Sequence, residues 1–505
     1  MKTVNALACV AVLVFTWLTL RHVHESVFLE DQVDQLQNFE SLWHFEPYAL
    51  LGPAMSDTRP TAHALGPTGA ILLGLPVTLG LGIDGIHAIT SLLIAVATAV
   101  AFVTLLRIDD RFAWLWFWIF SATWIVWWNA GLLWVNTLLL PAGVLLLGLG
   151  ASCLWQPTLF KLALLVLVAV LALHVHLVAL VTAPVVAIVT AATGREALRH
   201  PWSRREAVAI GLLALAAFGP YLVAEVLTGF QNSRAMLAHL QKTTEAQPLA
   251  MATAMQTLLI ATDPTRAFTS IGVSDGVVLA ISSALATFVV VAVFRRMRHQ
   301  GSSATREAGA GRVLLWLTLI AIAAIIGQAV FFLLMRRPLA GYQYVTLLAP
   351  FYAVVPAVFL RLVLARPLQS GASVSLVAGA CVVFLVWTGP SRADGSMAPA
   401  MWSYRNIVRA IDDLCGDGAA DTAEGPGFAE VLNPRYDGVL QYLMKRRFSS
   451  CRYEPGAALL IAANREGHYE DWYVVGTRRY RRDTVRFPGI ALYRLVRPPS
   501  PGSER

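Results

Sequence analysis

An acidic pair follows the first apolar segment of the chain and could provide a base. The apolar run that begins near Val4 ends near Leu20, and Glu30 and Asp31 come shortly afterwards. A carboxylate just outside a membrane helix can accept the proton of an acceptor hydroxyl if its geometry and pKa suit. The alternative interpretation is an acidic stretch that only faces water. Asp57, further along the same polar stretch, is an acidic neighbour of the pair.

Three histidines are candidates for substrate contact. His174 and His176 interrupt one long apolar stretch, and on a continuous helix this spacing would point the two rings apart. If the chain turns there instead, both rings could face a polar cavity. His63 lies in the polar stretch after the first apolar run, where exposed histidines are the commoner case. No convincing third and fourth ligands for zinc accompany these residues, so we predict no metal site and no certain cofactor, with a divalent cation left as an option.

The composition indicates a membrane protein. Of the 505 residues, 57% are hydrophobic and 14% are charged, against roughly 45–50% and about 25% in soluble domains. Disordered, collagen-like and disulfide-rich secreted proteins are excluded by the same values. The net charge of +8 does not indicate nucleic-acid binding, because the basic residues lie between apolar runs, where membrane topology accounts for them.

The apolar runs predict a mainly α polytopic membrane protein with about eleven transmembrane helices, since each span needs about 20 apolar residues. The runs lie near residues 4–20, 86–106, 112–128, 131–153, 160–173, 175–193, 207–228, 275–294, 313–335, 343–364 and 372–389. The stretch Gly66–Ile83 is also apolar, but it is short and broken by Gly and Pro, so we expect an interfacial or re-entrant helix there. The tryptophans between Trp114 and Trp134 are typical of an aromatic belt at helix ends.

The basic residues predict the orientation in the membrane. With a cytoplasmic N-terminus, the positive-inside rule is obeyed by the loops at 107–111, 161, 195–205, 295–312 and 361–366. The odd number of spans then places the C-terminal segment outside, in a multi-pass protein of the plasma (inner) membrane. Arg336 and Arg337 break the rule, because they lie at the outer end of the span from 313. Such charges call for a functional explanation; the alternative is that both side chains reach out to lipid headgroups.

Two domains are predicted. Residues 1–390 form the transmembrane domain, which includes a first outer loop at 21–85, and residues 391–505 form a small soluble extracytoplasmic domain. The last 115 residues hold 17 Lys and Arg and 14 Asp and Glu, so this segment is far more polar than the rest.

The C-terminal segment has the pattern of a small α/β or α+β fold. Helix-like patterns at 402–415 and 435–447 alternate with strand-like patterns at 458–463, 472–475 and 490–496. Cys415 and Cys451 both fall in this segment. If it lies outside the cell, these two cysteines can form a disulfide.

The order of features along the chain resembles the GT-C glycosyltransferases. The first span and the acidic pair are followed by Leu51–Ser56 (LGPAMS) and Leu65–Gly69 (LGPTG), which lead into the broken apolar helix. Later segments that are similar to motifs of this superfamily, in the same order, are Gly131–Pro141, Gly219–Glu225, Gly229–Arg234, Arg336–Pro338, Tyr342–Tyr344 and Pro350. The likeness covers roughly residues 1–365 and is greatest to the bacterial protein-mannosyltransferase and aminoarabinose-transferase-like branch. The C-terminal segment carries no signature of the family.

The resemblance implies roles for the site residues. In that superfamily the first extracytoplasmic loop carries the catalytic acidic pair. Asp31-Gln32 matches its Asp-Gln variant, and Glu30-Asp31 matches the commoner pair in reverse order, so Asp31 is the first candidate and Glu30 the second. The residues implied to bind substrate or the donor phosphate are Arg336, Arg337, Tyr342, Tyr344, Asp57, His63, His174 and His176.

The function implied is an inverting hexosyl or pentosyl transfer from a polyprenyl-phosphate carrier to an extracytoplasmic acceptor, which could be a cell-envelope glycan, a lipid or a protein. The leaving phosphate gains negative charge, and guanidinium groups bind phosphate well. The expected partners are the lipid-linked donor, the envelope acceptor and membrane lipids, but no nucleic acid. The alternative is a lipid or glycan transporter or flippase, which predicts charges near the bilayer midplane and an internal repeat; neither is clear in the sequence.

Overall fold

The computed structural model describes part of the chain, which falls into two compact units. The described residues are 2–21, 30–44, 46–52, 63, 66–130, 135–199, 203–245, 284, 287–289, 291–292, 295, 306–334 and 346–363, with six strands between 427 and 495. The first unit comprises Met1–Leu20, Asn38–Ala130 and Val135–Thr388, and the second comprises Arg21–Gln37, Gly131–Trp134 and Gly389–Arg505. The predicted domains 1–390 and 391–505 stay a prediction.

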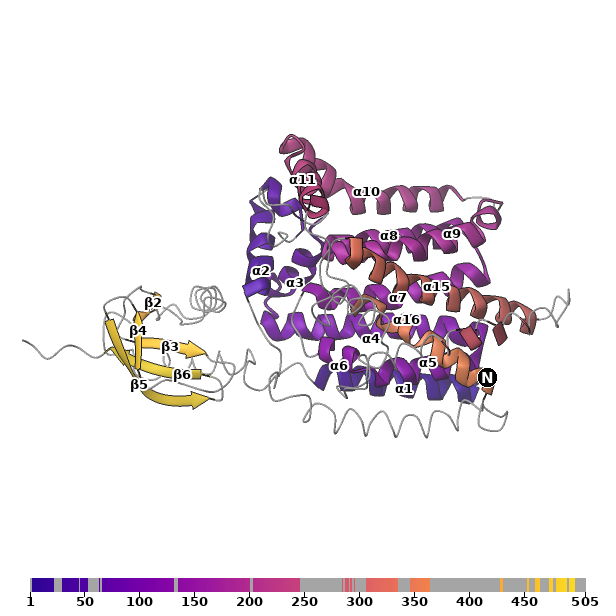
Figure 1. Ribbon diagram of the computed structural model, residues 1–505, viewed down its shortest axis with the longest axis horizontal. Helices are drawn as coiled ribbons and strands as arrows, with labels where there is room; N and C mark the ends of the chain where they lie inside the picture. Colours follow the sequence, from indigo (N-terminus) through magenta and orange to yellow (C-terminus); the bar gives the residue numbers. More distant parts are fainter. Residues whose placement is uncertain are drawn as a thin grey trace, which may run out of the picture. The chain divides into compact units, whose positions relative to one another are not determined.

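The first unit is a stack of long helices that run back and forth (Figure 1). These helices are α1 (Lys2–Arg21), α4 (Gly82–Ile108), α5 (Asp110–Ala122), α7 (Leu139–Trp155), α8 (Leu159–Val175), α9 (Ala183–Ala197), α10 (Arg204–Leu227), α15 (Arg306–Leu334) and α17 (Val354–Val363). Six segments of the described chain are long and apolar enough to cross a membrane: Asp84–Ile108, Asn136–Trp155, Leu177–Ala197, Arg204–Leu227, Gly309–Phe331 and Thr346–Val363. The protein is therefore an integral membrane protein.

The predicted span at 112–128 is divided in the structure. Helix α5 ends at Ala122, and α6 (Trp124–Ala130) follows as a separate short helix. Thr123 between them has an extended backbone, and its hydroxyl donates to the Phe120 carbonyl at 2.6 Å. That side-chain bond competes with the helical pattern, as threonine often does.

The structure divides one further apolar stretch and leaves two of the predicted spans wholly or mostly undescribed. The long apolar stretch at 160–193 is interrupted at His176, between α8 and the 3-10 helix η4 (Leu177–Thr182) that precedes α9. The predicted span at 372–389 lies outside the described residues, and so does most of that at 275–294. The count of eleven spans therefore stays a prediction.

Polar caps begin three of the helices at the same end of the first unit. Ser203 forms a capping box with Glu206 at the start of α10, where Ser203 Oγ accepts from the Glu206 N–H at 3.1 Å and the Ser203 N–H donates to Glu206 Oε2 at 3.0 Å. Asp109 caps α5 and Thr158 caps α8 in the same way, through side-chain oxygens. Such caps satisfy N–H groups that the first turn leaves open and contribute about 0.5–2 kcal/mol each.

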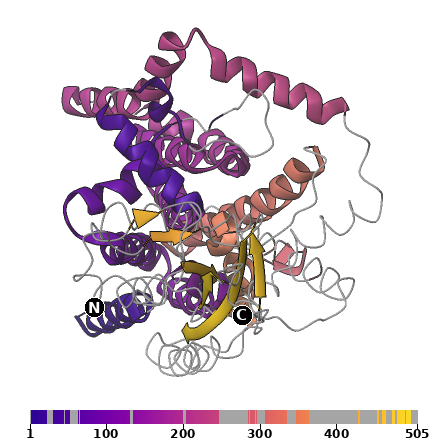
Figure 2. The same cartoon turned by 90° about the vertical axis from the view of Figure 1, so that its left-hand side faces the viewer.

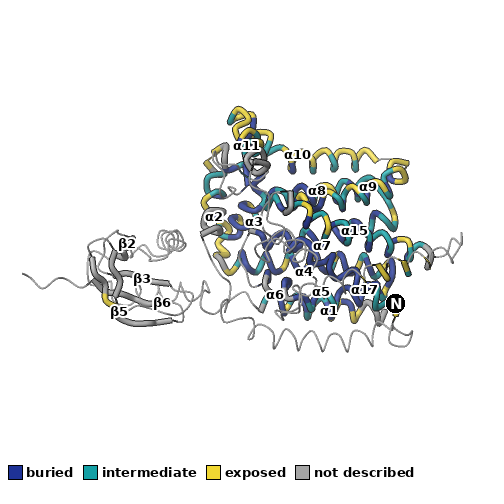
Figure 3. Tube along the Cα trace, viewed as in Figure 1, coloured by how far each residue is buried: buried dark blue, intermediate teal, exposed yellow. Residues whose placement is uncertain are grey.

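Aromatic side chains of α4 and α5 form a core. Phe102 stacks on Phe117 with ring centroids 4.6 Å apart and meets Trp114 edge-on at 4.9 Å, contacts worth about 0.5–1.5 kcal/mol each beyond burial. Trp116 Nε1 donates to the carbonyl of Pro350 at 3.0 Å, which ties α5 to α16 (Ala349–Tyr352). Most of α5 is buried (Figure 3). The expectation of an aromatic belt is therefore wrong for Trp114 and Trp116, whose rings fill the space between helices.

Helix α3 (Thr68–Thr78) is the short helix expected within Gly66–Ile83. Its 11 residues are too few to cross a bilayer. It packs against α2 (Glu30–Trp43) at Gly74, where a Cβ atom would lie 2.2 Å from Cγ of Phe39. Only glycine allows the two helices to approach this closely. The depth of α3 in the membrane stays a prediction.

The second unit contains a six-stranded mixed sheet. Its strands are β1 (Gly427–Ala429), β2 (Arg452–Tyr453), β3 (Leu459–Ala463), β4 (Trp472–Val475), β5 (Arg478–Phe487) and β6 (Ile490–Leu495), in the order β2-β1-β3-β6-β5-β4. The pairs of β1 with β2 and with β3 are parallel, and the other pairs are antiparallel.

The three predicted strands of the C-terminal segment correspond to β3, β4 and β6. The basic run at Arg478–Arg482 lies in β5, which has a neighbour on both sides and is an interior strand. The predicted helices at 402–415 and 435–447 lie outside the described residues, as do Cys415 and Cys451. The α/β class of this segment therefore stays a prediction.

Candidate functional site

The two ends of the first unit differ in the polar residues that they carry. Helices α5, α8 and α10 begin at the end where the N-terminus lies, near Arg107, Lys161 and Arg204 (Figure 1). At the opposite end lie α3 and the start of α11 (Gln231–Glu245), and Figure 2 looks onto this end. Neutral and acidic polar side chains are linked there across segments that are distant in the sequence.

The candidate catalytic carboxylates open helix α2. Glu30 and Asp31 are its first two residues, where the partial positive charge of a helix N-terminus favours negative charge. Their side chains lie outside what the structure describes, so their roles stay a prediction. The same holds for Asp57, Arg336, Arg337, Tyr342 and Tyr344, which all fall outside the described residues.

His63 is held by two partners from different parts of the chain. Its backbone N–H donates to Asn232 Oδ1 at 2.7 Å, and its carbonyl accepts from Asn232 Nδ2 at 3.3 Å. The imidazole Nδ1 lies 3.2 Å from the carbonyl oxygen of Gly52 and must carry the proton, because a carbonyl can only accept. His63 thus joins two positions of the segment between α2 and α3 to the start of α11.

The surroundings of His63 favour its neutral form. Burial lowers the pKa of His63 below the ordinary value of 6.5, and the hydrogen bond to the Gly52 carbonyl opposes this shift. Desolvation acts in this direction because it disfavours the charged imidazolium. In a neutral ring with its proton on Nδ1, Nδ1 is the donor and Nε2 is the acceptor.

His174 links the start of α3 to two other helices. Thr68 Oγ1 lies 2.9 Å from His174 Nδ1, and the backbone of Ala217 on α10 bonds the same ring. The ring lies directly over Gly66, where a Cβ atom would be 2.5 Å from His174 Nδ1. His174 is 2% exposed, so the contact is shielded from water. The structure gives His174 a bridging position, and its substrate contact stays a prediction.

His176 has a local role in the structure. The chain turns at this residue, and His176 Nδ1 accepts from the Val178 N–H at 3.0 Å at the start of η4. The turn that the two-histidine hypothesis required is therefore present. Whether His176 also contacts substrate stays a prediction.

The elbow between α10 and α11 is braced by a buried carboxylate. Ser233 Oγ lies 2.9 Å from Glu225 Oε1, to which it donates, and the Tyr221 hydroxyl lies 2.9 Å from Ser233 Oγ. The backbone carbonyl of Glu225 accepts from the Phe230 N–H at 2.7 Å. Phe230 has a φ of 62°, a conformation that costs a residue with a side chain about 1–2 kcal/mol.

Asn232, Ser233 and Glu225 are polar residues in this network to which the sequence interpretation gave no individual role. A signal was present, since a carboxylate in the last turns of an apolar span is costly and is a functional candidate by default. Glu225 is 1% exposed. The pairing of Asn232 with His63 had no sequence signal, because 169 residues separate the two.

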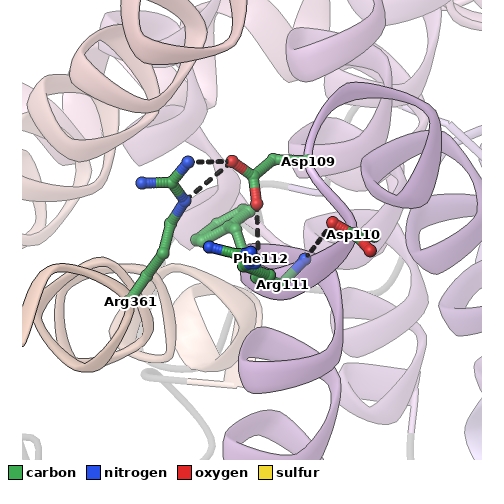
Figure 4. A network of polar contacts seen from close by, with 5 residues as sticks. All are labelled: Asp109, Asp110, Arg111, Phe112 and Arg361. Atoms are coloured by element: carbon green, nitrogen blue, oxygen red, sulfur yellow. Dashed lines mark hydrogen bonds and ion pairs between the residues drawn. The ribbon is translucent and has the colours of Figure 1, made fainter. Parts of the chain in front are cut away.

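At the opposite end, Asp109 and Arg361 form an ion pair (Figure 4). Asp109 Oδ2 accepts from Arg361 Nε at 2.7 Å and also contacts Nη2, while Oδ1 accepts from the Phe112 N–H at 2.9 Å. Both oxygens of the Asp109 carboxylate therefore have partners within the protein, and the ion pair has a structural role: it joins α17 to the start of α5. Within the part of the chain that is described, no group of three or more His, Cys, Asp or Glu residues could hold a metal ion.

An apolar cavity of about 560 Å³ opens between α8 and α9. Its lining includes Leu173, which directly precedes His174, and Leu180 and Thr182 of η4. Its lining holds no titratable side chain, so it offers space for hydrocarbon and no chemistry of its own.

Comparison with known proteins gives one structural likeness. No family model matches the chain, and no curated protein matches it. The cryo-EM structure of the arabinofuranosyltransferase AftD from Mycobacteria superposes with a TM-score of 0.33 and 14% sequence identity, over 98% of this chain and 40% of that one. The chain thus spans well under half the length of AftD.

Proposed function

We propose that this chain is a membrane glycosyltransferase of the GT-C type, which moves a sugar from a polyprenyl-phosphate carrier to an acceptor at the extracytoplasmic face. The observation that carries the proposal is the order of motifs along roughly residues 1–365, from the acidic pair after α1 to the two arginines after α15. The polar links around His63 and His174 support it, because they tie together segments that belong to these motifs, Gly52 and Gly66–Thr68.

The proposed reaction has a base and a phosphate-binding group. Asp31, with Glu30 as the second candidate, accepts the proton of the acceptor hydroxyl as that oxygen attacks the anomeric carbon with inversion. The bond to the carrier phosphate breaks, and Arg336 and Arg337 stabilise the charge that develops on the leaving phosphate. Tyr342, Tyr344, Asp57, His63, His174 and His176 are proposed to line the donor and acceptor positions.

The proposed topology places the reaction outside the cytoplasm. The end of the first unit that carries Arg107, Lys161 and Arg204 faces the cytoplasm, as the positive-inside rule requires. The opposite end, with His63 and His174, then faces outward. The segment from residue 391 is proposed to be a separate extracytoplasmic domain.

The test is transfer by Asp31→Asn in proteoliposomes. The full chain is given a panel of polyprenyl-phosphate-linked hexoses and pentoses together with a cell-envelope extract that supplies acceptor hydroxyls, and release of polyprenyl phosphate is measured. Loss of a general base costs about 10²–10⁴ in rate, so Asp31→Asn should lose turnover while Glu40→Gln, a change further along α2, should not. A wild type that releases no polyprenyl phosphate but moves lipid between leaflets would favour the flippase alternative and overturn the proposal.

A further inference from the structure

The side chain of Asn232 binds both backbone polar groups of one distant residue. Its Oδ1 accepts from the His63 N–H at 2.7 Å, and its Nδ2 donates to the His63 carbonyl at 3.3 Å. An asparagine amide fits this task because it offers one acceptor and two donors on adjacent atoms. Asn232 is 2% exposed, so water does not readily take over either bond. We call this pair of bonds the Asn232–His63 clasp.

Residues on both sides of Asn232 in the sequence are hydrogen-bonded to Glu225. Before it, the Phe230 N–H donates to the backbone carbonyl of Glu225 at 2.7 Å. After it, Ser233 Oγ donates to the carboxylate of the same Glu225 at 2.9 Å. Glu225 lies in the last turn of α10, a long apolar helix. Asn232 is therefore tied to the end of α10 by hydrogen bonds on both sides of it in the sequence.

The segment that receives the clasp connects α2 to α3. The 3-10 helix η2 (Pro47–Leu50) of this segment packs on α10. The His63 ring also bonds the carbonyl of Gly52, two residues after the end of η2. This bond joins η2 to the clasp. At its other end the segment is held by the Thr68–His174 contact. The clasp is thus the middle of three attachments between the first outer loop and the helices α8, α10 and α11.

We propose that Asn232 is a positioning residue for the transfer reaction: through His63 it holds the segment between α2 and α3, a part of the first outer loop, in the orientation that turnover needs. The inference rests on the proposed function. The clasp lies outside the aromatic core of α4 and α5, so its loss leaves the helix bundle intact and changes the placement of the loop.

The first experiment measures the clasp without any activity. The full chain in nanodiscs is compared by hydrogen–deuterium exchange with Asn232→Ala and with Leu237→Ala, whose exposed side chain lies on the same helix. The His63 N–H is the backbone donor of the clasp, so the peptide that contains it should exchange about tenfold faster in Asn232→Ala, as loss of one buried hydrogen bond allows. Peptides from α4 and α7 should be unchanged, and Leu237→Ala should match the wild type.

The second experiment separates kcat from KM with a polyprenyl-phosphate-linked sugar that the wild type uses. Asn232→Ala should lower kcat by about 10–100-fold, with a donor KM within about threefold of the wild type because Arg336 and Arg337, the proposed ligands of the donor phosphate, are unchanged. Asn232→Asp keeps the acceptor for the His63 N–H but loses the donor, so its kcat should lie between the two. A merely structural role would instead lower the fraction of folded protein and leave kcat per folded molecule unchanged.

The outcomes are distinguishable. If the wild type turns over no donor in the panel, the proposed function fails and this inference falls with it. If the wild type is active and Asn232→Ala keeps the wild-type kcat, the function stands and the positioning role is wrong. Unchanged exchange at His63 in Asn232→Ala would overturn the clasp itself.

Discussion

Asp109 and Arg361 are 252 residues apart in the sequence, and Asp109 Oδ2 accepts from Arg361 Nε at 2.7 Å. The same carboxylate caps α5 through the Phe112 N–H. The start of α5 and the last turn of α17 are thereby fixed to one another, and α5 also packs on α17 along its side. Since the side chains of Asp109 and Arg361 are only 6% and 18% exposed, loss of either partner leaves the other charge buried.

The first prediction follows from this ion pair. Asp109→Ala should destabilise the protein by about 3–5 kcal/mol, because it strands the Arg361 guanidinium and removes the cap of α5. Thermal unfolding in detergent checks this. Asp110→Ala is the matched control, since Asp110 is exposed and bonds only the adjacent Arg111 N–H among the contacts described. Equal melting temperatures for the two variants would contradict the structural role of the pair.

The second prediction concerns the contact between Gly66 and His174. Gly66→Ala places a methyl group 2.5 Å from His174 Nδ1, and we expect a loss of about 1–3 kcal/mol from overpacking. His174→Ala removes the obstructing ring, so the double variant should be less destabilised than the sum of the two single changes. Additive effects in a double-mutant cycle of unfolding free energies would show that the two residues do not touch.

A third prediction is a pH dependence from His63. Its pKa is lowered in the folded protein by burial, so the unfolded chain binds a proton at a higher pH than the folded one does. Above the ordinary pKa of 6.5, His63 does not reduce the free energy of unfolding. This free energy falls as the pH drops below 6.5, and it stops falling once the pH is below the pKa of His63 in the folded protein. The free energy of unfolding should differ less between pH 7.5 and about pH 5.5 for His63→Gln than for the wild type. His44→Gln, at an exposed position, should keep the wild-type difference; if His63→Gln keeps it too, the ring is not buried as described.

The fourth prediction tests the proposed phosphate-binding arginines. Arg336→Ala and Arg337→Ala should each impair use of the lipid-linked donor more than binding of the acceptor, because the growing charge is on the leaving phosphate. Loss of one such electrostatic contact typically lowers kcat by about 10²–10³. Donor kinetics at the wild-type level in both variants would mean that these residues only anchor the helix end at the membrane surface.

The fifth prediction is a disulfide between Cys415 and Cys451. The proposed topology places both outside the cytoplasm, where thiols oxidise, and the closed loop would contribute about 3–4 kcal/mol. Neither cysteine should react with a maleimide in intact cells before reduction, and both should react after it. Labelling of both thiols without reduction would contradict the bond, and labelling only after the membrane is opened would contradict the topology.

Local pattern was enough to predict most of the helices. The apolar runs at 86–106, 207–228 and 313–335 correspond to α4, α10 and α15, because a run of some 20 apolar residues has few alternatives to a helix. The strands β3, β4 and β6 were predictable from a different local pattern, short apolar runs between polar residues. The run at 112–128 is interrupted at Thr123, where the backbone is extended, and hydropathy does not register such a change.

The sequence by itself determined that this is a membrane protein and where its apolar helices lie, and it offered candidate residues for chemistry. Only the tertiary structure decided which polar residues meet: His63 with Asn232, His174 with Thr68, Asp109 with Arg361. Hydropathy depends on neighbours within one or two helical turns. Each of these pairs joins residues more than 100 positions apart, so it forms only when the helices pack and their polar ends come together.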